Sequence, residues 1–136
     1  MDSDRYKEAD LTKKIIGLAM KVHNEIGPGF PEKIYHQAMI VALSDNKFDI
    51  ESEKEYNICY QNTHLGTFRL DIIVNSKVVI ELKAVVGEVP KAFQAQTISY
   101  LKASGLEIAL LINFGNESLT VKRLARYKNF NKNKSV

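Results

Sequence analysis

The sequence is short of cysteine, of long apolar runs and of any targeting segment. Its single cysteine, Cys59, excludes an internal disulfide framework and fits a reducing compartment. No apolar run approaches the roughly 18 residues needed to span a bilayer, and the longest covers residues 108–112. Residues 1–4 are acidic and no apolar segment follows them, which argues against a secretory signal. These absences predict a cytoplasmic protein that does not enter a membrane.

What remains is the composition of an ordinary globular protein. The 136 residues are 45% hydrophobic and 26% charged, which suffices for one buried core and matches the usual size of one domain. No internal repeat and no low-complexity stretch divides the chain. We therefore expect one domain over residues 1–128, followed by a polar, basic tail over residues 129–136.

The net charge of +3 conceals an uneven distribution. Every charged residue after Glu117 is basic, so the chain up to that point is net acidic. A basic edge of this kind can attract polyanions, or it can act only as a solvated segment that keeps the protein in solution. The basic residues concerned are Lys122, Arg123, Arg126, Lys128, Lys132 and Lys134.

Hydrophobic periodicity predicts three helices and five strands in the order ααβββαββ. Apolar residues at helical spacing mark the helices, over residues 11–26, 31–43 and 91–103. Alternating or continuous apolar segments mark the strands, over residues 50–60, 66–74, 78–85, 107–114 and 119–124. This order predicts an α/β fold of the α+β type, in which helices pack against a mixed sheet. We expect Cys59 to be buried in the first strand.

Three charged residues stand out because they interrupt strongly apolar strands. Asp71 lies in the second predicted strand, and Glu81 and Lys83 lie in the third. Ionised groups are seldom buried without partners, so charges at these positions need an explanation. Glu81 and Lys83 are two residues apart and therefore point to the same face of their strand.

Whether Asp71 joins them depends on the turn between the two strands. A two-residue loop would put Asp71 and Glu81 on opposite faces of the sheet. A three-residue loop over residues 75–77, or a bulge, places Asp71 opposite Glu81. Asn75 or Ser76 with a positive φ could supply the extra residue. A shared site therefore requires this register.

With that register, two carboxylates and one ammonium converge. Carboxylate oxygens suit Mg²⁺ or Mn²⁺, which can polarise a phosphodiester and lower the pKa of an attacking water. Lys83 could then orient that water or neutralise charge on the phosphate. The alternative is an inert sheet in which Lys83 forms a structural salt bridge with Asp71 or Glu81.

The spacing Asp71…Glu81-Leu82-Lys83 resembles the D…(D/E)xK core of the PD-(D/E)xK nuclease superfamily. Residues 29–35, Gly-Phe-Pro-Glu-Lys-Ile-Tyr, are similar to the signature of the GxxExxY protein family. Later segments resemble that family's blocks in the same order, namely residues 81–85, Gln96 with residues 100–101, and residues 111–115. The resemblance extends from about residue 11 to residue 123 and implies a restriction-endonuclease-like core.

The resemblance also implies which residues form the site. The implied catalytic residues are Asp71, Glu81, Lys83 and Gln96, and the implied ligands of Mg²⁺ or Mn²⁺ are Glu32, Asp71 and Glu81. Glu32 lies in the first turn of a predicted helix, where a negative charge is favourable in itself, so a helix-start role is the alternative. The chain departs from the superfamily pattern at Leu70, where the motif has a proline that varies widely.

These residues predict a metal-dependent nuclease, with DNA favoured as its substrate. The alternative is a nucleic-acid- or protein-binding module with little or no turnover, because so small a chain has no evident specificity domain. Arg69, Arg123 and Arg126 are candidate contacts to a nucleic-acid backbone, although Arg69 could simply pair with an acid. The three histidines have no zinc spacing and are expected at ordinary surface or core-edge positions. A homodimer stays open.

Overall fold

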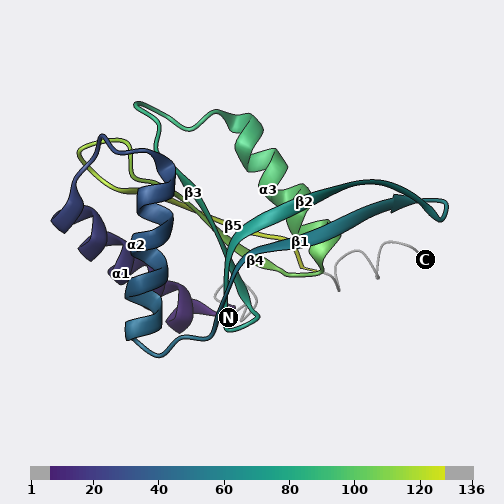
Figure 1. Ribbon diagram of the computed structural model, residues 1–136, viewed down its shortest axis with the longest axis horizontal. Helices are drawn as coiled ribbons and strands as arrows, with labels where there is room; N and C mark the ends of the chain where they lie inside the picture. The colour runs from purple at the N-terminus through teal and green to yellow at the C-terminus, as the bar shows by residue number, and fades with distance from the viewer. Residues whose placement is uncertain (1–6, 128–136) are drawn as a thin grey trace.

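The computed structural model describes residues 7–127, which contain three helices and five strands (Figure 1). Their order is ααβββαββ, as the sequence predicts. The helices are α1 (Ala9–Ile26), α2 (Glu32–Asp45) and α3 (Lys91–Ser104), and the strands are β1 (Ile50–Tyr60), β2 (Thr63–Val74), β3 (Val78–Lys83), β4 (Ile108–Asn113) and β5 (Thr120–Ala125). The basic tail predicted over residues 129–136 lies outside the described residues.

The strands form one mixed sheet in the order β1-β2-β3-β4-β5. All neighbouring pairs are antiparallel except β3 and β4, which are parallel and are connected through α3. α1 and α2 cover one face of the sheet and α3 covers the other (Figure 1). β4 is buried along its whole length, which explains the continuous apolar segment in the sequence. The predicted mixed sheet is confirmed.

The two faces of the sheet bury separate apolar clusters. Ile80 belongs to the larger cluster under α1 and α2, whereas its neighbour Val79 packs with Leu101 under α3. This alternation is that of a regular strand, in which successive side chains point to opposite faces. Glu81 and Lys83 therefore lie on the α3 face, together with Val79.

A hydrogen-bonded turn between α1 and α2 sets the position of Glu32. The hydroxyl of Tyr35 donates a hydrogen bond to the carbonyl oxygen of Gly27 (2.6 Å) and accepts one from the N–H of Phe30 (3.2 Å). The side chain of Tyr35 is fully buried, and its ring stacks on Phe114 with 4.7 Å between centroids. The turn is thereby tied to the core, and Glu32 follows as the first residue of α2.

β2 and β3 are joined by the three-residue loop that a shared acidic site requires. Val74 pairs with Val78, so three residues lie between them. The first two, Asn75 and Ser76, have φ values of 52° and 56°. This left-handed conformation is tolerated by asparagine more readily than by most residues. Of the two loop lengths that the sequence leaves open, the structure has the one that a shared site requires.

β1 and β2 form a long hairpin that extends beyond α3 (Figure 1). Its outer part carries Ile58, Tyr60 and Leu65, which are all exposed. Cys59 lies in the same part and is also exposed, so its predicted burial is wrong. The alternating pattern identifies the strand correctly, but the core that would cover Cys59 ends before this part of the hairpin.

Candidate active site

The backbone pairing of β2 and β3 stops just before the two candidate acids. Ile72 and Ile80 form the last pair of the ladder. Beyond them, the N–H of Asp71 donates to Oε2 of Glu81 (3.0 Å), and the N–H of Leu82 donates to Oδ2 of Asp71 (2.8 Å). The two carboxylates therefore lie side by side at the junction of the strands.

A second irregularity lies on the other side of Asp71. Glu53 of β1 is opposite Asp71, between two regular pairs, and has a φ of 53° that non-glycine residues rarely adopt. On β2, Leu70 and Ile73 both belong to the α3-face cluster, whereas Ile72 belongs to the cluster on the opposite face. The alternation of faces thus shifts by one residue at Asp71. Local distortions of this kind re-aim side chains and are frequent beside active sites.

The buried environment disfavours charge on both acids. The side chain of Glu81 is only 7% exposed. Burial, followed by the negative charge of Asp71, raises the pKa of Glu81 to about 8, although the N–H of Asp71 and the charge of Lys83 oppose the rise. Burial also raises the pKa of Asp71, and the hydrogen bond from Leu82 opposes this shift. A positive charge nearby would favour the ionised form of both acids and so lower both pKa values.

Lys83 lies two residues after Glu81 on the same strand face, but it does not neutralise the acids by direct contact. Its ammonium lies 3.9 Å from the ring centroid of Phe93 on α3. Among the ion pairs of residues 7–127, none joins Lys83 to Asp71 or Glu81. The structural salt bridge considered as an alternative is therefore not formed in the described part of the chain.

Glu32 stands near the acidic pair without joining it. Partial burial raises the pKa of Glu32; Lys83 lowers it, Asp71 raises it further and His36 opposes the rise. The charges of Lys83 and Asp71 therefore act on Glu32 as well as on Glu81. Within residues 7–127, however, no three acidic, histidine or cysteine side chains are grouped closely enough to hold a metal ion. The structure brings Asp71 and Glu81 together and leaves Glu32 further away.

Gln96 lies on α3 and makes no hydrogen bond or ion pair with the acids in the described part of the chain. It is three residues after Phe93 and four before Tyr100, so the three share one stripe of the helix. Gln96 is exposed, and no hydrogen bond joins it to another residue of the described chain. Tyr100 instead stacks on Phe68 at 4.5 Å, and burial, Glu81 and Asp71 raise the pKa of Tyr100.

His36 belongs to the neighbourhood of the site, which the sequence does not predict. Its Nε2 forms a hydrogen bond with the hydroxyl oxygen Oγ of Ser52 at 2.9 Å. When protonated, its positive charge opposes the rise in pKa that burial causes at Asp71 and Glu32. Its position four residues after Glu32 places both on one helix face, and that spacing is the signal by which the sequence could have identified it.

Hydrogen bonds with Asn113, the last residue of β4, fix the segment that follows Lys83. The side-chain amide of Asn113 donates to the carbonyl oxygen of Val85 (2.9 Å), and its oxygen accepts the N–H of Val85 (2.9 Å). Gly115 passes so close that a Cβ there would lie 2.3 Å from the carbonyl oxygen of Val85. The motif at residues 111–115 therefore has a structural role beside the site, which sequence spacing alone does not predict.

The arginines predicted as nucleic-acid contacts are not gathered around the acids. Arg69 is exposed and forms an ion pair with Glu55 at 3.5 Å. Arg126 directly follows β5, and its N–H donates to the carbonyl oxygen of Glu107, the residue before β4 (2.8 Å). Lys83 lies at the other end of these strands, opposite Asn113. Arg126 is thus distant from the lysine along the strand direction.

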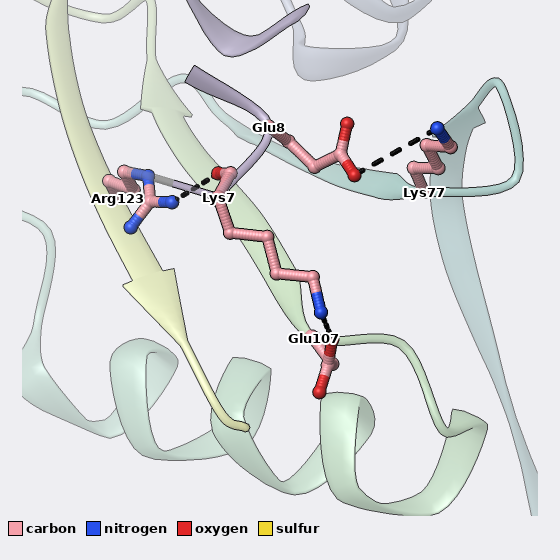
Figure 2. Close-up of polar contacts among 5 residues, drawn as sticks. All are labelled: Lys7, Glu8, Lys77, Glu107 and Arg123. Atoms are coloured by element: carbon pink, nitrogen blue, oxygen red, sulfur yellow. Dashed lines mark hydrogen bonds and ion pairs between the residues drawn. The ribbon is translucent and has the colours of Figure 1, made fainter. Parts of the chain in front are cut away.

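Arg123 contacts the N-terminal segment. It pairs with Leu110 across β4 and β5 and therefore faces α1 and α2, on the opposite side of the sheet from Glu81. Its guanidinium donates to the carbonyl oxygen of Lys7 (2.6 Å), and the ammonium of Lys7 pairs with Glu107 (Figure 2). The contact that the structure shows for Arg123 is a structural one.

The protein thus has an α/β fold in which a mixed sheet lies between helices, with two neighbouring carboxylates at a strand junction and a lysine two residues after the second. The chain belongs to the PD-(D/E)XK nuclease superfamily, whose family model matches residues 9–124. That match covers all the helices and strands of the described chain except the last residue of β5.

Among solved structures, SSO0001 is similar to this chain, with a TM-score of 0.57 and 20% sequence identity. The similarity covers 74% of this chain and 52% of SSO0001, so this chain spans about half the length of that protein. At this identity the likeness shows the fold alone. No curated protein matches the sequence significantly. Among the helices of residues 7–127, none is long and apolar enough to cross a membrane.

Proposed function

We propose that this protein is a metal-dependent nuclease that hydrolyses phosphodiester bonds of nucleic acid, with DNA as the favoured substrate. The observation that carries the proposal is the pairing of Asp71 and Glu81 across the β2–β3 junction. Each carboxylate uses one oxygen to accept a backbone N–H. No buried side-chain oxygen among the described residues lacks a hydrogen-bond partner, so the second oxygen of each acid is within reach of solvent.

This pair of carboxylates fits Mg²⁺ or Mn²⁺. These ions prefer carboxylate oxygens, and Mg²⁺ keeps several waters, so two protein ligands suffice to hold it. A cation would also relieve the conflict between charges that raises the pKa of Glu81 to about 8. Glu32 is proposed as a third, more distant ligand. When bound, the ion polarises a phosphodiester oxygen and lowers the pKa of a water.

Two further side chains are proposed to act on the substrate. Lys83 lies on the same face as Glu81 and supplies positive charge to the phosphate as negative charge develops on it. Gln96 supports the substrate or Lys83 from α3. The GxxExxY signature over residues 29–35 supports membership of the GxxExxY family. The proposal includes a single domain over residues 1–128 and a cytoplasmic location.

A binding module with little or no turnover is the second candidate function. It is favoured by one observation, since Glu32 does not complete a three-ligand group with the acidic pair in the described structure. Such a module would bind nucleic acid or a partner protein without forming a metal-dependent product. A homodimer is compatible with either function, and light scattering would reveal it.

The proposed function is tested by incubating labelled DNA and RNA with the purified protein in Mg²⁺ or Mn²⁺, with EDTA as the control. Lys83→Ala should abolish cleavage with the fold intact, as circular dichroism would show. Lys54→Ala is the matched control, because Lys54 also lies over an aromatic ring, that of Tyr56 at 5.5 Å, but on the exposed hairpin. Cleavage that K83A does not reduce would reject the role of Lys83. Binding without product would favour the module.

A further inference from the structure

A pocket lies beside the acidic pair on the α3 face of the sheet. Its volume is about 460 Å³, and it is bounded by the first turn of α3 and by strands β4 and β5. Its lining includes two lysines, one acid and three uncharged polar side chains, namely Lys91, Lys122, Glu88, Gln94, Asn116 and Thr120. Leu111 adds an apolar floor. None of these residues has a part in the site described above.

Strand register connects the pocket to the acids. Glu81 pairs with Leu111 across β3 and β4, and Leu111 pairs with Lys122 across β4 and β5. Neighbouring strands lie about 4.8 Å apart, so the backbone of Lys122 is about 10 Å from that of Glu81. Leu124, two residues after Lys122, packs in the α3-face cluster. Glu81, Leu111 and Lys122 therefore form one row on one face.

The two lysines of the pocket are available to an external anion. Both Lys91 and Lys122 are exposed. Within residues 7–127, neither takes part in an ion pair. Glu88 contributes the one negative charge of the pocket lining, so the lysines leave an excess of positive charge. Arg123 differs, because its guanidinium donates a hydrogen bond to the carbonyl oxygen of Lys7 on the opposite face of the sheet.

We propose that this pocket is a phosphate-binding subsite for the substrate strand, with Lys122 and Lys91 as its contacts. The inference rests on the proposed function, because it places a flanking phosphate of the strand whose scissile phosphate lies at Asp71 and Glu81. The ligand class is a nucleic-acid strand, and the floor at Leu111 offers apolar surface to its sugar or base. The subsite acts on any sequence, because phosphate contacts carry no base information.

The test is the salt dependence of binding of a fluorescein-labelled single-stranded oligodeoxynucleotide, measured in EDTA so that metal-dependent cleavage does not interfere. Lys122→Gln and Lys91→Gln should each reduce the magnitude of the slope of log K against log salt by about 0.7. When the salt concentration rises fourfold, the fold-loss in affinity of each variant should then be about 2- to 3-fold smaller than that of the unmodified protein. Lys102→Gln, in the last turn of α3, and Lys21→Gln, on α1, remove the same charge elsewhere and should leave the slope unchanged.

The outcomes separate this subsite from the nuclease proposal. Three results would each overturn the subsite, whatever the cleavage assay gives. K122Q and K91Q could leave the slope unchanged, the two control variants could reduce it equally, or the unmodified protein could fail to bind the oligonucleotide. Reduced slopes without any metal-dependent cleavage would support the subsite and reject the nuclease. Circular dichroism of each variant confirms that the fold is retained.

Discussion

Glu81 accepts the backbone N–H of Asp71 at the point where the pairing of β2 and β3 ends. Asp71 in turn accepts the N–H of Leu82, so each acid is bonded to the strand of the other. The pair therefore stabilises the sheet at the same place where it forms the candidate active site. Amide substitutions are the informative ones here, because asparagine and glutamine keep an acceptor oxygen for these N–H groups.

The metal-free protein should lose stability as the pH rises from about 4.5 to about 8. Burial and then the charge of Asp71 raise the pKa of Glu81 from 4.5 to about 8, so in this range the folded state keeps a proton that the unfolded state has released. Glu81→Gln removes this transition. The free energy of unfolding of E81Q minus that of the unmodified protein should therefore increase by more than about 1 kcal/mol as the pH rises across this range. One pKa unit corresponds to about 1.4 kcal/mol.

Urea unfolding in EDTA at the two ends of this range measures the effect. The relevant quantity is the change with pH of the difference between E81Q and the unmodified protein, because any constant cost of the substitution cancels. A constant difference for E81Q would contradict the predicted titration.

Mn²⁺ should stabilise the folded protein through the acidic pair. At a concentration of about 100 times the dissociation constant, binding to the folded state adds about 2.7 kcal/mol to the free energy of unfolding. Asp71→Asn and E81Q should lose this gain, whereas Glu32→Gln should keep most of it because Glu32 stands apart from the pair. Thermal unfolding with and without the ion gives the comparison. An equal gain in D71N would place the ion elsewhere.

Phe93 should hold Lys83 in position before substrate binds. The ammonium is 3.9 Å from the ring centroid, and such contacts contribute about 0.5–2 kcal/mol. Phe93→Leu should release Lys83 and lower cleavage about 2- to 30-fold, whereas Phe93→Tyr keeps a ring and should retain activity.

NMR of the protein with its lysines dimethylated tests this position without relying on activity. The ring current of residue 93 should shift the Lys83 signal in the unmodified protein and in F93Y, but not in F93L. Lys54, which lies over Tyr56, is the internal reference and should not change. An unshifted Lys83 signal in the unmodified protein would disprove the contact.

Gly115 should tolerate no side chain. A Cβ there would lie 2.3 Å from the carbonyl oxygen of Val85, so Gly115→Ala must displace the segment that follows Lys83. We expect a loss of about 1–3 kcal/mol in the free energy of unfolding, together with reduced cleavage. Gly17→Ala is the matched control, because a Cβ on this exposed helical residue meets nothing within 4 Å. It should be neutral or stabilising by up to about 1 kcal/mol. Chemical denaturation compares the two, and equal effects would contradict the prediction.

Much of the fold is predictable from local patterns. All eight elements and their order follow from helical spacing and apolar strands, since these patterns reflect which side each residue presents to the core. The three-residue turn that contains Asn75 and Ser76 follows only if Asp71 and Glu81 share a site, because the alternation of strand faces then requires that length or a bulge. The exposure of Cys59 does not follow, because a strand pattern does not reveal how far the covering helix extends.

The surroundings of the acidic pair are less predictable. His36 and Asn113 reach the neighbourhood of the site from α2 and from the end of β4, which are distant from Asp71 in the sequence. Phe93 lies under Lys83 because the connection through α3 returns across the same face of the sheet. The helical spacing from Glu32 could have indicated His36, but no local spacing indicates Asn113 or Phe93.

The amino-acid sequence by itself determined the order of the elements and the position of the carboxylates and the lysine within apolar strands. It left open the turn length on which the meeting of Asp71 and Glu81 depends. Only the tertiary structure decided which basic residue of β5 shares their face. The pairing of β4 with β5 turns Lys122 toward α3 and Arg123 toward α1 and α2. The physical reason is that side chains alternate along a strand, so a register shift of one residue would exchange the two.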